Sequence, residues 1–436
     1  MNPLQLNYLE NKNGTLYIDG VSTLELTEKF KTPLYVLSQS RIEENFRRLN
    51  SALKKHYNKI RIYYSAKANS NISVLKILLK EGAWLDAVSP GEIFLGLKAG
   101  FPADKILFTG TSVSEEEVKY AVEVGATINI DSLSQLKKLL KITVPEVLSV
   151  RVNPGIGFGH HNYCITGGEE SKFGLWQNEA EKAYKEAEKA GVKKFGIHMH
   201  IGSGILNINV FTQAAEVFLN IVKEIKENCG LTFDFINFGG GLGVPYKPEE
   251  TELSIEKYAE SIISIFKRKI KDLNSEPFFA IEPGRYIVCD AGILLTKAVS
   301  IKVTPTKKFI GVDAGLNVLI RPAMYNAYHH ILVANKLNEE KLEEYDVVGP
   351  ICESADFLAK KRIMPKVDEG DVLAVLNTGA YGFSMSSQYN ARPRPAEVLV
   401  NKGRFELIRE RENFNTLLIG QRIATWLKQN FGKCMD

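Results

Sequence analysis

The 436-residue sequence has few cysteines, almost no net charge and no long apolar run, and each shortage excludes a class of protein. Its five cysteines, at positions 164, 229, 289, 352 and 434, are odd in number and include no C-x-x-C pair. Neither a disulfide framework nor a structural zinc site is therefore indicated, and we expect reduced thiols, mostly buried. The 55 basic and 51 acidic residues give a formal net charge of only +4. Nucleic acid and membrane surfaces are therefore not expected as partners.

No stretch of the sequence is long and apolar enough to span a bilayer. The N-terminal segment has neither the basic region nor the apolar core of a secretory signal, so we expect a cytoplasmic protein. What is present is the composition of a globular protein, with 44% hydrophobic and 24% charged residues. The length predicts two domains, or one large barrel with a smaller partner.

Eight short apolar runs lie between Arg61 and Gly284, and each except the last is followed by a helix-compatible segment. Strands that alternate with helices form a parallel sheet, and eight such units are typical of a (β/α)8 TIM barrel, an α/β fold. The runs predicted as strands are 61–66, 84–88, 106–109, 126–130, 147–152, 195–200, 233–238 and 278–283.

The pattern changes after Gly284, where β-rich segments follow one another without comparable helices. We therefore predict a C-terminal all-β domain, a sandwich or barrel-like fold, over residues 284–436, with one closing helix near 414–430. The first residues also contain strand patterns, TLYIDG and PLYVLS. Residues 1–35 are expected to pack with the β domain, which leaves residues 36–283 as the barrel.

Four unusual features fall at the C-terminal ends of predicted strands, where barrel enzymes keep their chemistry. Lys67 closes the first strand in YYSAKANSN, and HMH (198–200) closes the sixth. A glycine-rich loop from Gly239 follows the seventh strand, and EPGR (282–285) follows the eighth. A lysine at a strand end ordinarily extends its amine into water. Four such features on one face of a barrel predict a shared site instead.

The loop NFGGGLGVPY offers backbone N–H groups without side chains at Gly239, Gly240 and Gly241, which suits a phosphate. A dinucleotide fingerprint is excluded, because Val244 stands at the sixth position of G-x-G-x-x-G and a proline follows. A tight turn without a ligand is the alternative. Arg285 is placed to add positive charge to the same phosphate.

Glu282 ends the eighth strand at the barrel mouth, where a carboxylate stays charged only beside a cationic partner. That partner is either Arg285 or the protonated ring nitrogen of a cofactor. An amine that forms a Schiff base, a carboxylate for a ring nitrogen and a phosphate cup are together what pyridoxal phosphate requires. The two histidines of HMH are an alternative metal site, but no later strand end offers a histidine to complete it. We expect no metal, and His200 as a flat ring beside the cofactor.

Six motifs, YYSAKAN, HMHIGSG, GGGLG, EPGR, GPICESAD and GAYGFSMSSQYN, occur in one order along the chain. With them the sequence resembles, over nearly its whole length, the fold-type III pyridoxal-phosphate decarboxylases, the family related to alanine racemase and ornithine decarboxylase. The resemblance implies a carboxy-lyase with pyridoxal 5′-phosphate as cofactor and a small amino acid as substrate. It also implies a homodimer with active sites shared across its interface. The most similar branch converts meso-2,6-diaminopimelate to L-lysine and CO2, in lysine biosynthesis.

The resemblance implies a role for each matching residue. Lys67 is expected to form the Schiff base, and His200 to stack on the cofactor ring. Cys352 and Glu353 resemble the pair that crosses the dimer interface, with the cysteine as proton donor; a buried inert thiol is the alternative for Cys352. The expected cofactor contacts are Lys67, His200, Ser203, Gly239, Gly240, Gly241, Glu282, Gly284, Arg285 and Tyr381.

The segment LIRPAMYNAYH bears on substrate choice, because ornithine-type relatives place an aspartate there for a distal amine. Arg321 in this segment suits a distal carboxylate, which an arginine binds in a bidentate pair. One alternative is a decarboxylase of arginine, ornithine or carboxynorspermidine, and Arg321 argues against it. The other is a non-catalytic pyridoxal-phosphate carrier, and the β domain argues against that. Gly204 stands where relatives usually carry glutamine, with no evident consequence. The expected substrate contacts are Arg285, Arg321, Tyr325, Glu353 and Tyr381.

Overall fold

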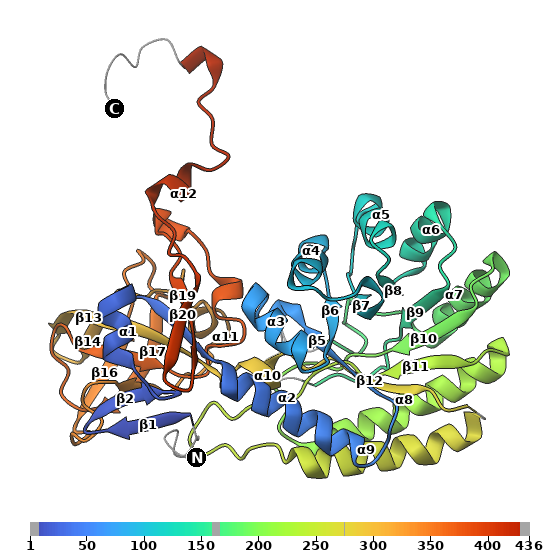
Figure 1. Cartoon of the computed structure of the whole chain (residues 1–436), viewed down its shortest axis with the longest axis horizontal. Helices are drawn as coiled ribbons and strands as arrows, with labels where there is room; N and C mark the ends of the chain where they lie inside the picture. The colour runs from blue at the N-terminus through green and yellow to red at the C-terminus, as the bar shows by residue number, and fades with distance from the viewer. Residues whose placement is uncertain (1–7, 159–165, 274, 428–436) are drawn as a thin grey trace.

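The structure is a computed structural model that describes residues 8–158, 166–273 and 275–427. It shows a barrel with a β domain beside it (Figure 1). The expectations for Cys164, for Cys434 and for residues 428–430 fall outside the described residues.

Eight parallel strands close into the barrel and follow one another around the ring in sequence order. Their bounds agree with the predicted runs to within two residues, and the predicted barrel with its adjoining β domain is confirmed. The strands are β5 (Ile60–Ser65), β6 (Trp84–Ala87), β7 (Ile106–Phe108), β8 (Thr127–Ile130), β9 (Val147–Arg151), β10 (Lys194–His198), β11 (Phe233–Asn237) and β12 (Phe278–Ile281).

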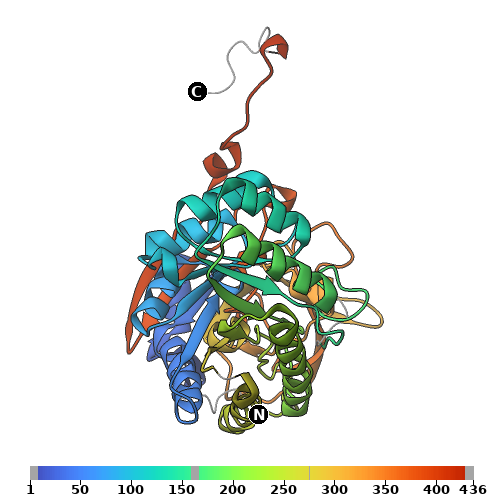
Figure 2. The same cartoon turned by 90° about the vertical axis from the view of Figure 1, so that its right-hand side faces the viewer.

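Helices between the strands form an outer ring (Figure 2). Several begin where a serine caps the first turn: Ser89, Ser114 and Ser132 each accept a hydrogen bond from the backbone N–H three residues later. No helix among the described residues is both long and apolar enough to cross a membrane. The helices are α2 (Gln39–Lys54), α3 (Ile72–Lys80), α4 (Pro90–Ala99), α5 (Glu115–Glu123), α6 (Leu133–Ile142), α7 (Gln177–Ala190), α8 (Ile208–Cys229) and α9 (Ile255–Ile270).

The barrel interior is apolar at its floor, which is the end opposite the predicted site. Arg61 lies at this end, with its guanidinium 3.9 Å from the ring centre of Phe278 and paired with Asp234 at 2.9 Å. Because the floor is filled, a ligand has to enter from the C-terminal ends of the strands. The buried side chains of the floor are Tyr63, Leu107, Phe235 and Ala280.

The β domain combines the N-terminal segment with the C-terminal third of the chain. Strand β4 (Leu34–Ser38) lies between β13 and β19, antiparallel to the first and parallel to the second, and leads directly into α2 of the barrel. Its other strands are β13 (Gly292–Val303), β14 (Lys308–Val312), β15 (Ile331–Val333), β16 (Glu343–Val348), β17 (Phe357–Met364), β18 (Val372–Val375), β19 (Ala396–Asn401) and β20 (Arg404–Arg409).

Two terminal segments differ from the sequence-based expectation. The N-terminal strands β1 (Leu9–Lys12), β2 (Thr15–Ile18) and β3 (Val21–Ser22) are followed by a helix that was not predicted, α1 (Thr23–Phe30). The closing helix predicted over 414–430 is wrong in its extent: α12 covers only Phe414–Leu418, and a single 3₁₀ turn follows at Thr425–Leu427. The backbone leaves the helical region at Ile419, whose ψ is 122°, and Gly420 follows with φ of 82°, in the left-handed region. The domain limits at residues 35 and 283 stay predictions.

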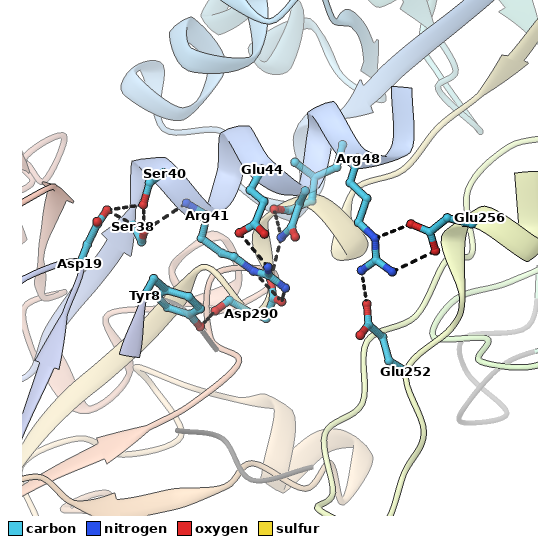
Figure 3. A network of polar contacts seen from close by, with 12 residues as sticks. Tyr8, Asp19, Ser38, Ser40, Arg41, Glu44, Arg48, Glu252, Glu256 and Asp290 are labelled. Atoms are coloured by element: carbon cyan, nitrogen blue, oxygen red, sulfur yellow. Dashed lines mark hydrogen bonds and ion pairs between the residues drawn. The ribbon is translucent and has the colours of Figure 1, made fainter. Parts of the chain in front are cut away.

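Helix α2 joins the barrel to the start of the β domain through a polar network (Figure 3). Arg41 pairs with Asp290 at 2.6 Å, and Asn45 donates to the same carboxylate at 2.8 Å. Asp290 lies between α10 (Arg285–Val288) and β13. The network therefore fixes the position of α10, which carries Arg285 into the barrel mouth.

Candidate functional site

A cavity of about 400 Å³ opens at the C-terminal ends of the barrel strands, where the sequence predicted it. Side chains from the β domain, including Arg321 of α11 (Arg321–Tyr325), complete its wall. The predicted site residues that line it are Lys67, His200, Ser203, Gly241, Glu282, Gly284, Arg285, Arg321, Tyr325 and Tyr381.

Gly239 and Gly240 do not line the cavity; they let the loop after β11 pack against its neighbours. A Cβ on Gly239 would lie 2.3 Å from the backbone oxygen of Met199, and one on Gly240 would lie 2.5 Å from that of Glu282. The next residue, Gly241, faces the cavity, and its carbonyl accepts a hydrogen bond from the backbone N–H of Ile205 at 2.9 Å. The loops after β10 and β11 are thereby held together at the cavity wall.

Lys67 lies on a short 3₁₀ turn (Ala66–Ala68) that follows β5, with its Nζ 3.0 Å from Oδ2 of Asp86. Asp86 is fully buried at the end of β6 and also accepts a hydrogen bond from Ser65 at 2.8 Å. Burial alone would lower the pKa of Lys67, but the charge of Asp86, with Tyr381 and Glu282, raises the pKa above its usual value. The amine is therefore an ammonium ion paired with Asp86.

Glu282 is buried and receives hydrogen bonds at both carboxylate oxygens. Its Oε2 lies 3.0 Å from Nε2 of His198, and its Oε1 accepts from Asn237 at 2.8 Å. Burial alone would raise the pKa of Glu282, but His198, Lys67 and Arg151 outweigh that effect and lower the pKa. Glu282 is therefore a carboxylate at the cavity wall, and its partner among the described residues is His198, not Arg285 as one alternative held.

His200 faces the cavity as a neutral ring. Its Nδ1 accepts a hydrogen bond from the backbone N–H of Gly202 at 3.1 Å and lies 2.7 Å from the hydroxyl of Thr166. Burial, followed by the charges of Arg151 and Lys67, holds the pKa of His200 well below its usual value. Because Nδ1 is an acceptor, the ring proton is on Nε2.

Arg285 provides positive charge at one end of the cavity. Its Nε and Nη2 lie 3.3 and 3.2 Å from the hydroxyl of Ser203, its Nη1 donates to the hydroxyl of Tyr246 at 2.5 Å, and its guanidinium lies 4.8 Å from the ring centre of Tyr381. These partners are neutral, so the charge of Arg285 is available to an anion. With the loop at Gly241, this end of the cavity suits a phosphate group.

Arg321 provides a second cation, 2% exposed, at the wall formed by the β domain. Its guanidinium lies 5.4 Å from the ring centre of Tyr246 and 5.8 Å from that of Tyr325. In the part of the chain that the structure describes, its Nε has no hydrogen-bond partner. A buried cation in contact with aromatic rings and open to a cavity indicates an anionic ligand.

Cys352 and Glu353 lie on the surface and do not line the cavity of their own chain. The thiol of Cys352 lies 3.3 Å from Oδ1 of Asn390, and Glu353 accepts a hydrogen bond from the hydroxyl of Tyr389. The alternative of a buried thiol is therefore wrong for Cys352. Of the other described cysteines, Cys229 is half-buried and Cys289 is buried, so the expectation of mostly buried thiols fails for this set.

Several residues of the site were not predicted. Asp86 holds Lys67, Asn237 holds Glu282, and Arg151 lines the cavity with its guanidinium 4.5 Å from the ring centre of Phe173. His198 was considered from the sequence only as a metal ligand, and it holds Glu282 instead. Each is a polar side chain within or at the end of an apolar strand run, as in WLDAV and FDFINF. A polar residue near the C-terminal end of a barrel strand was the available signal.

The residues present fit pyridoxal phosphate. The cavity has the volume of a small-molecule site. It offers an amine, a buried carboxylate, a neutral flat ring and a cationic end with a hydroxyl, which match the aldehyde, the ring nitrogen, the ring face and the phosphate of that cofactor.

Comparisons with known proteins agree with this fit. A family model described as "Pyridoxal-dependent decarboxylase, pyridoxal binding domain" matches residues 39–289. A diaminopimelate decarboxylase of Methanothermobacter thermautotrophicus is 50% identical over 96% of this chain and 98% of its own. A diaminopimelate decarboxylase of Archaeoglobus fulgidus is 42% identical, over 95% of this chain and 99% of its own. The crystal structure of the Methanocaldococcus jannaschii diaminopimelate decarboxylase with L-lysine matches with a TM-score of 0.90 at 36% identity. The match covers 97% of this chain and 99% of the M. jannaschii chain. The predicted resemblance is confirmed, and the chain belongs to the diaminopimelate decarboxylase family of pyridoxal-dependent decarboxylases.

Proposed function

We propose that this protein removes one carboxyl group of meso-2,6-diaminopimelate as CO2 and leaves L-lysine, with pyridoxal 5′-phosphate as its cofactor. The observation that carries the proposal is Arg321, a buried cation open to the cavity that Lys67 and Glu282 also line. The names of the relatives and the L-lysine in the M. jannaschii structure support the same substrate and product.

The wall of the cavity divides into groups that would each hold one part of the cofactor. Ser203 and Arg285, with the loop at Gly241 and the neighbouring Tyr381, would bind the phosphate. Lys67 would supply the amine that attaches the aldehyde carbon. When bound, the cofactor supplies an electron sink conjugated to the substrate Cα, which accepts the electrons left by CO2.

Three side chains control protons and charge beside the cofactor. Glu282, a carboxylate because its pKa is lowered, would keep a proton on the ring nitrogen. His200, neutral because its pKa is lowered, would lie against the ring without adding charge. Asp86 would pair with the Lys67 ammonium whenever that amine is not bonded to the cofactor.

Arg321 would bind the carboxylate at the distal end of the substrate, beside Tyr325. A carboxylate there completes the hydrogen bonding of the guanidinium, whereas the amine of ornithine would bring a second cation to it. This difference favours a dicarboxylic substrate over the amine-ended substrates of related decarboxylases.

Cys352 and Glu353 would act in the cavity of a second copy, as part of a homodimer. Their exposure and their separation from the cavity of their own chain support this arrangement. Glu353 would bind the distal ammonium of the substrate, and the thiol of Cys352 would deliver the proton to Cα after CO2 has left.

The function is tested by a CO2-release assay on meso-diaminopimelate, ornithine, arginine and carboxynorspermidine. We expect kcat/KM for meso-diaminopimelate to exceed the other values by at least about 10²-fold, because a buried charged group rejects a substrate that leaves it unpaired. Comparable values for ornithine would overturn the proposed substrate and the role of Arg321.

The shared site is tested by co-expression of two inactive variants, Lys67→Ala and Cys352→Ala. Random pairing gives hybrid dimers in half of the population, each with one intact site, so about a quarter of wild-type activity should return. A mixture that stays inactive would show that both residues act within one chain, or that no dimer forms. Light scattering distinguishes these two outcomes.

A further inference from the structure

The described part of the chain ends in an arm, residues 413–427, that stands away from the rest of the molecule (Figures 1 and 2). It consists of α12, the turn at Thr425–Leu427 and the extended segment between them. None of its residues is buried. Its large exposed apolar side chains are Phe414, Leu418, Ile419, Ile423, Trp426 and Leu427, which are 59–80% exposed.

This apolar surface is large for a protein that stays alone in water. Monomers rarely expose contiguous apolar patches of more than a few hundred Å². Phe414 and Trp426 would each bury about 150–250 Å², and the four aliphatic side chains add to that. One arm therefore supplies much of the roughly 800 Å² per partner that a standard interface buries, and a two-fold dimer would bury two arms.

The base of the arm is fixed to the body. Glu412 pairs with Arg394 at 2.5 Å and accepts a hydrogen bond from Gln388 at 2.8 Å. The guanidinium of Arg411 donates to the carbonyl oxygen of Pro33 at 2.7 Å. These contacts anchor the chain immediately before the arm begins.

The arm starts on the face that carries Cys352 and Glu353. Gln388, which holds Glu412, is followed by Tyr389 and Asn390, the residues that contact Glu353 and Cys352. The apolar arm is therefore continuous with the surface that the proposed function places at the dimer interface.

We propose that the arm packs on a second copy of this chain, reciprocally, and belongs to the interface that brings Cys352 and Glu353 to the partner's cavity. The inference rests on the shared site of the proposed function. The composition of the arm agrees with a protein partner, because Arg422 is its one charged residue. An anionic membrane surface would require a basic face, which this segment lacks.

The test compares the double variant Phe414→Ser/Trp426→Ser with Leu342→Ser, a substitution of an equally exposed apolar residue outside the arm. Light scattering over a range of concentrations gives the dimer dissociation constant. We expect the arm variant to raise it at least tenfold and the control to leave it unchanged. Activity lost by the arm variant should return as the protein concentration increases, which simple unfolding would not produce.

A second measurement follows Trp426 in the unmodified protein. The fluorescence of Trp426 is obtained by subtracting the emission spectrum of Trp426→Ser from that of wild type. This difference spectrum should be blue-shifted and protected from acrylamide quenching, because the partner would cover a side chain that is 80% exposed in the single chain. Solvent-like emission from Trp426, or an arm variant that keeps the wild-type dissociation constant, would refute the packing of the arm on the partner. Neither result would argue against the dimer itself. Arm-dependent binding to anionic vesicles by a protein whose dimer does not need the arm would also overturn it. A wild-type protein that is active as a monomer would overturn the shared site as well.

Discussion

Replacing Arg321 by methionine should leave the fold intact while it disables catalysis. The guanidinium is 2% exposed, its Nε has no partner among the described residues, and its neighbours are the rings of Tyr246 and Tyr325. Burial of a charge costs several kcal/mol when no opposite charge offsets it, whereas each cation–π contact returns only about 0.5–2 kcal/mol. Methionine keeps the unbranched stem and removes the charge. We therefore expect the free energy of unfolding to change by no more than about 1 kcal/mol, or to rise.

The catalytic effect follows from the hydrogen bonds that the variant cannot make to a substrate carboxylate. A bidentate pair is two charge-assisted bonds of about 1.5–3 kcal/mol each. Their loss, about 3–6 kcal/mol, corresponds to a decrease of about 10²- to 10⁴-fold in kcat/KM for meso-diaminopimelate. The assay is CO2 release under conditions that give kcat and KM separately, together with urea unfolding of the same samples.

Arg362→Met is the matched control. Arg362 is half-buried, lies 3.6 Å from the ring centre of Tyr328 and also has a buried Nε without a partner in the described chain, but it borders a different cavity. It should keep the wild-type kcat/KM. The reasoning is refuted if Arg321→Met stays within about threefold of wild type, or if both arginine variants lose activity equally. A loss of more than about 3 kcal/mol of stability would show that Arg321 has a partner in the free protein.

Two further predictions concern charged and buried groups near the cavity. Asp86→Asn should lower the pKa of Lys67, because the charge of Asp86 is the largest influence that raises this pKa. The cofactor-free variant should therefore capture pyridoxal phosphate faster than wild type near pH 7. An unchanged rate of capture, followed by visible absorbance, would contradict this. Burial, with the charge of Arg321, lowers the pKa of His329 to about 3, so the unfolded chain binds a proton below about pH 6.5 that the folded chain refuses. The stability that comes from a neutral His329 is complete above pH 6.5 and is lost as the pH falls toward 3. Between pH 6 and 4, His329→Gln should therefore reduce the slope of the free energy of unfolding against pH by about 1.4 kcal/mol per pH unit. Equal slopes for wild type and variant in urea unfolding would refute this prediction.

The barrel was predictable from the sequence because its signal is local. Each buried parallel strand is a short apolar run, and each helix repeats its apolar residues at its own period, so both are visible within about ten residues. The strand-end rule then placed Lys67, His200 and Glu282 on one face without any knowledge of their distances.

The partners of these residues were not predictable, because they depend on register between strands. Asp86 lies beside Lys67 since β5 and β6 pair with Ser65 opposite Asp86. His198 reaches Glu282 because β10, β11 and β12 are consecutive in the ring. In the sequence these residues are 19 and 84 positions apart, and each follows the alternation of an ordinary strand.

The charges around the cavity connect substrate choice to product release. The cations Lys67, Arg151, Arg285 and Arg321 stand against the carboxylates Asp86, Asp131 and Glu282, an excess of one positive charge. A bound phosphate carries about −1.5 to −2, which brings the cavity close to neutral. A substrate with two carboxylates and two ammonium groups adds no net charge, and in the proposed function its distal carboxylate would meet Arg321. Once CO2 has left, the product carries one positive charge, placed at the end of the cavity that holds Lys67. The proposed reaction would therefore replace a ligand without net charge by one whose new positive charge lies beside the cation Lys67. Ornithine, which has the product's charge from the start, would bring its distal ammonium to Arg321.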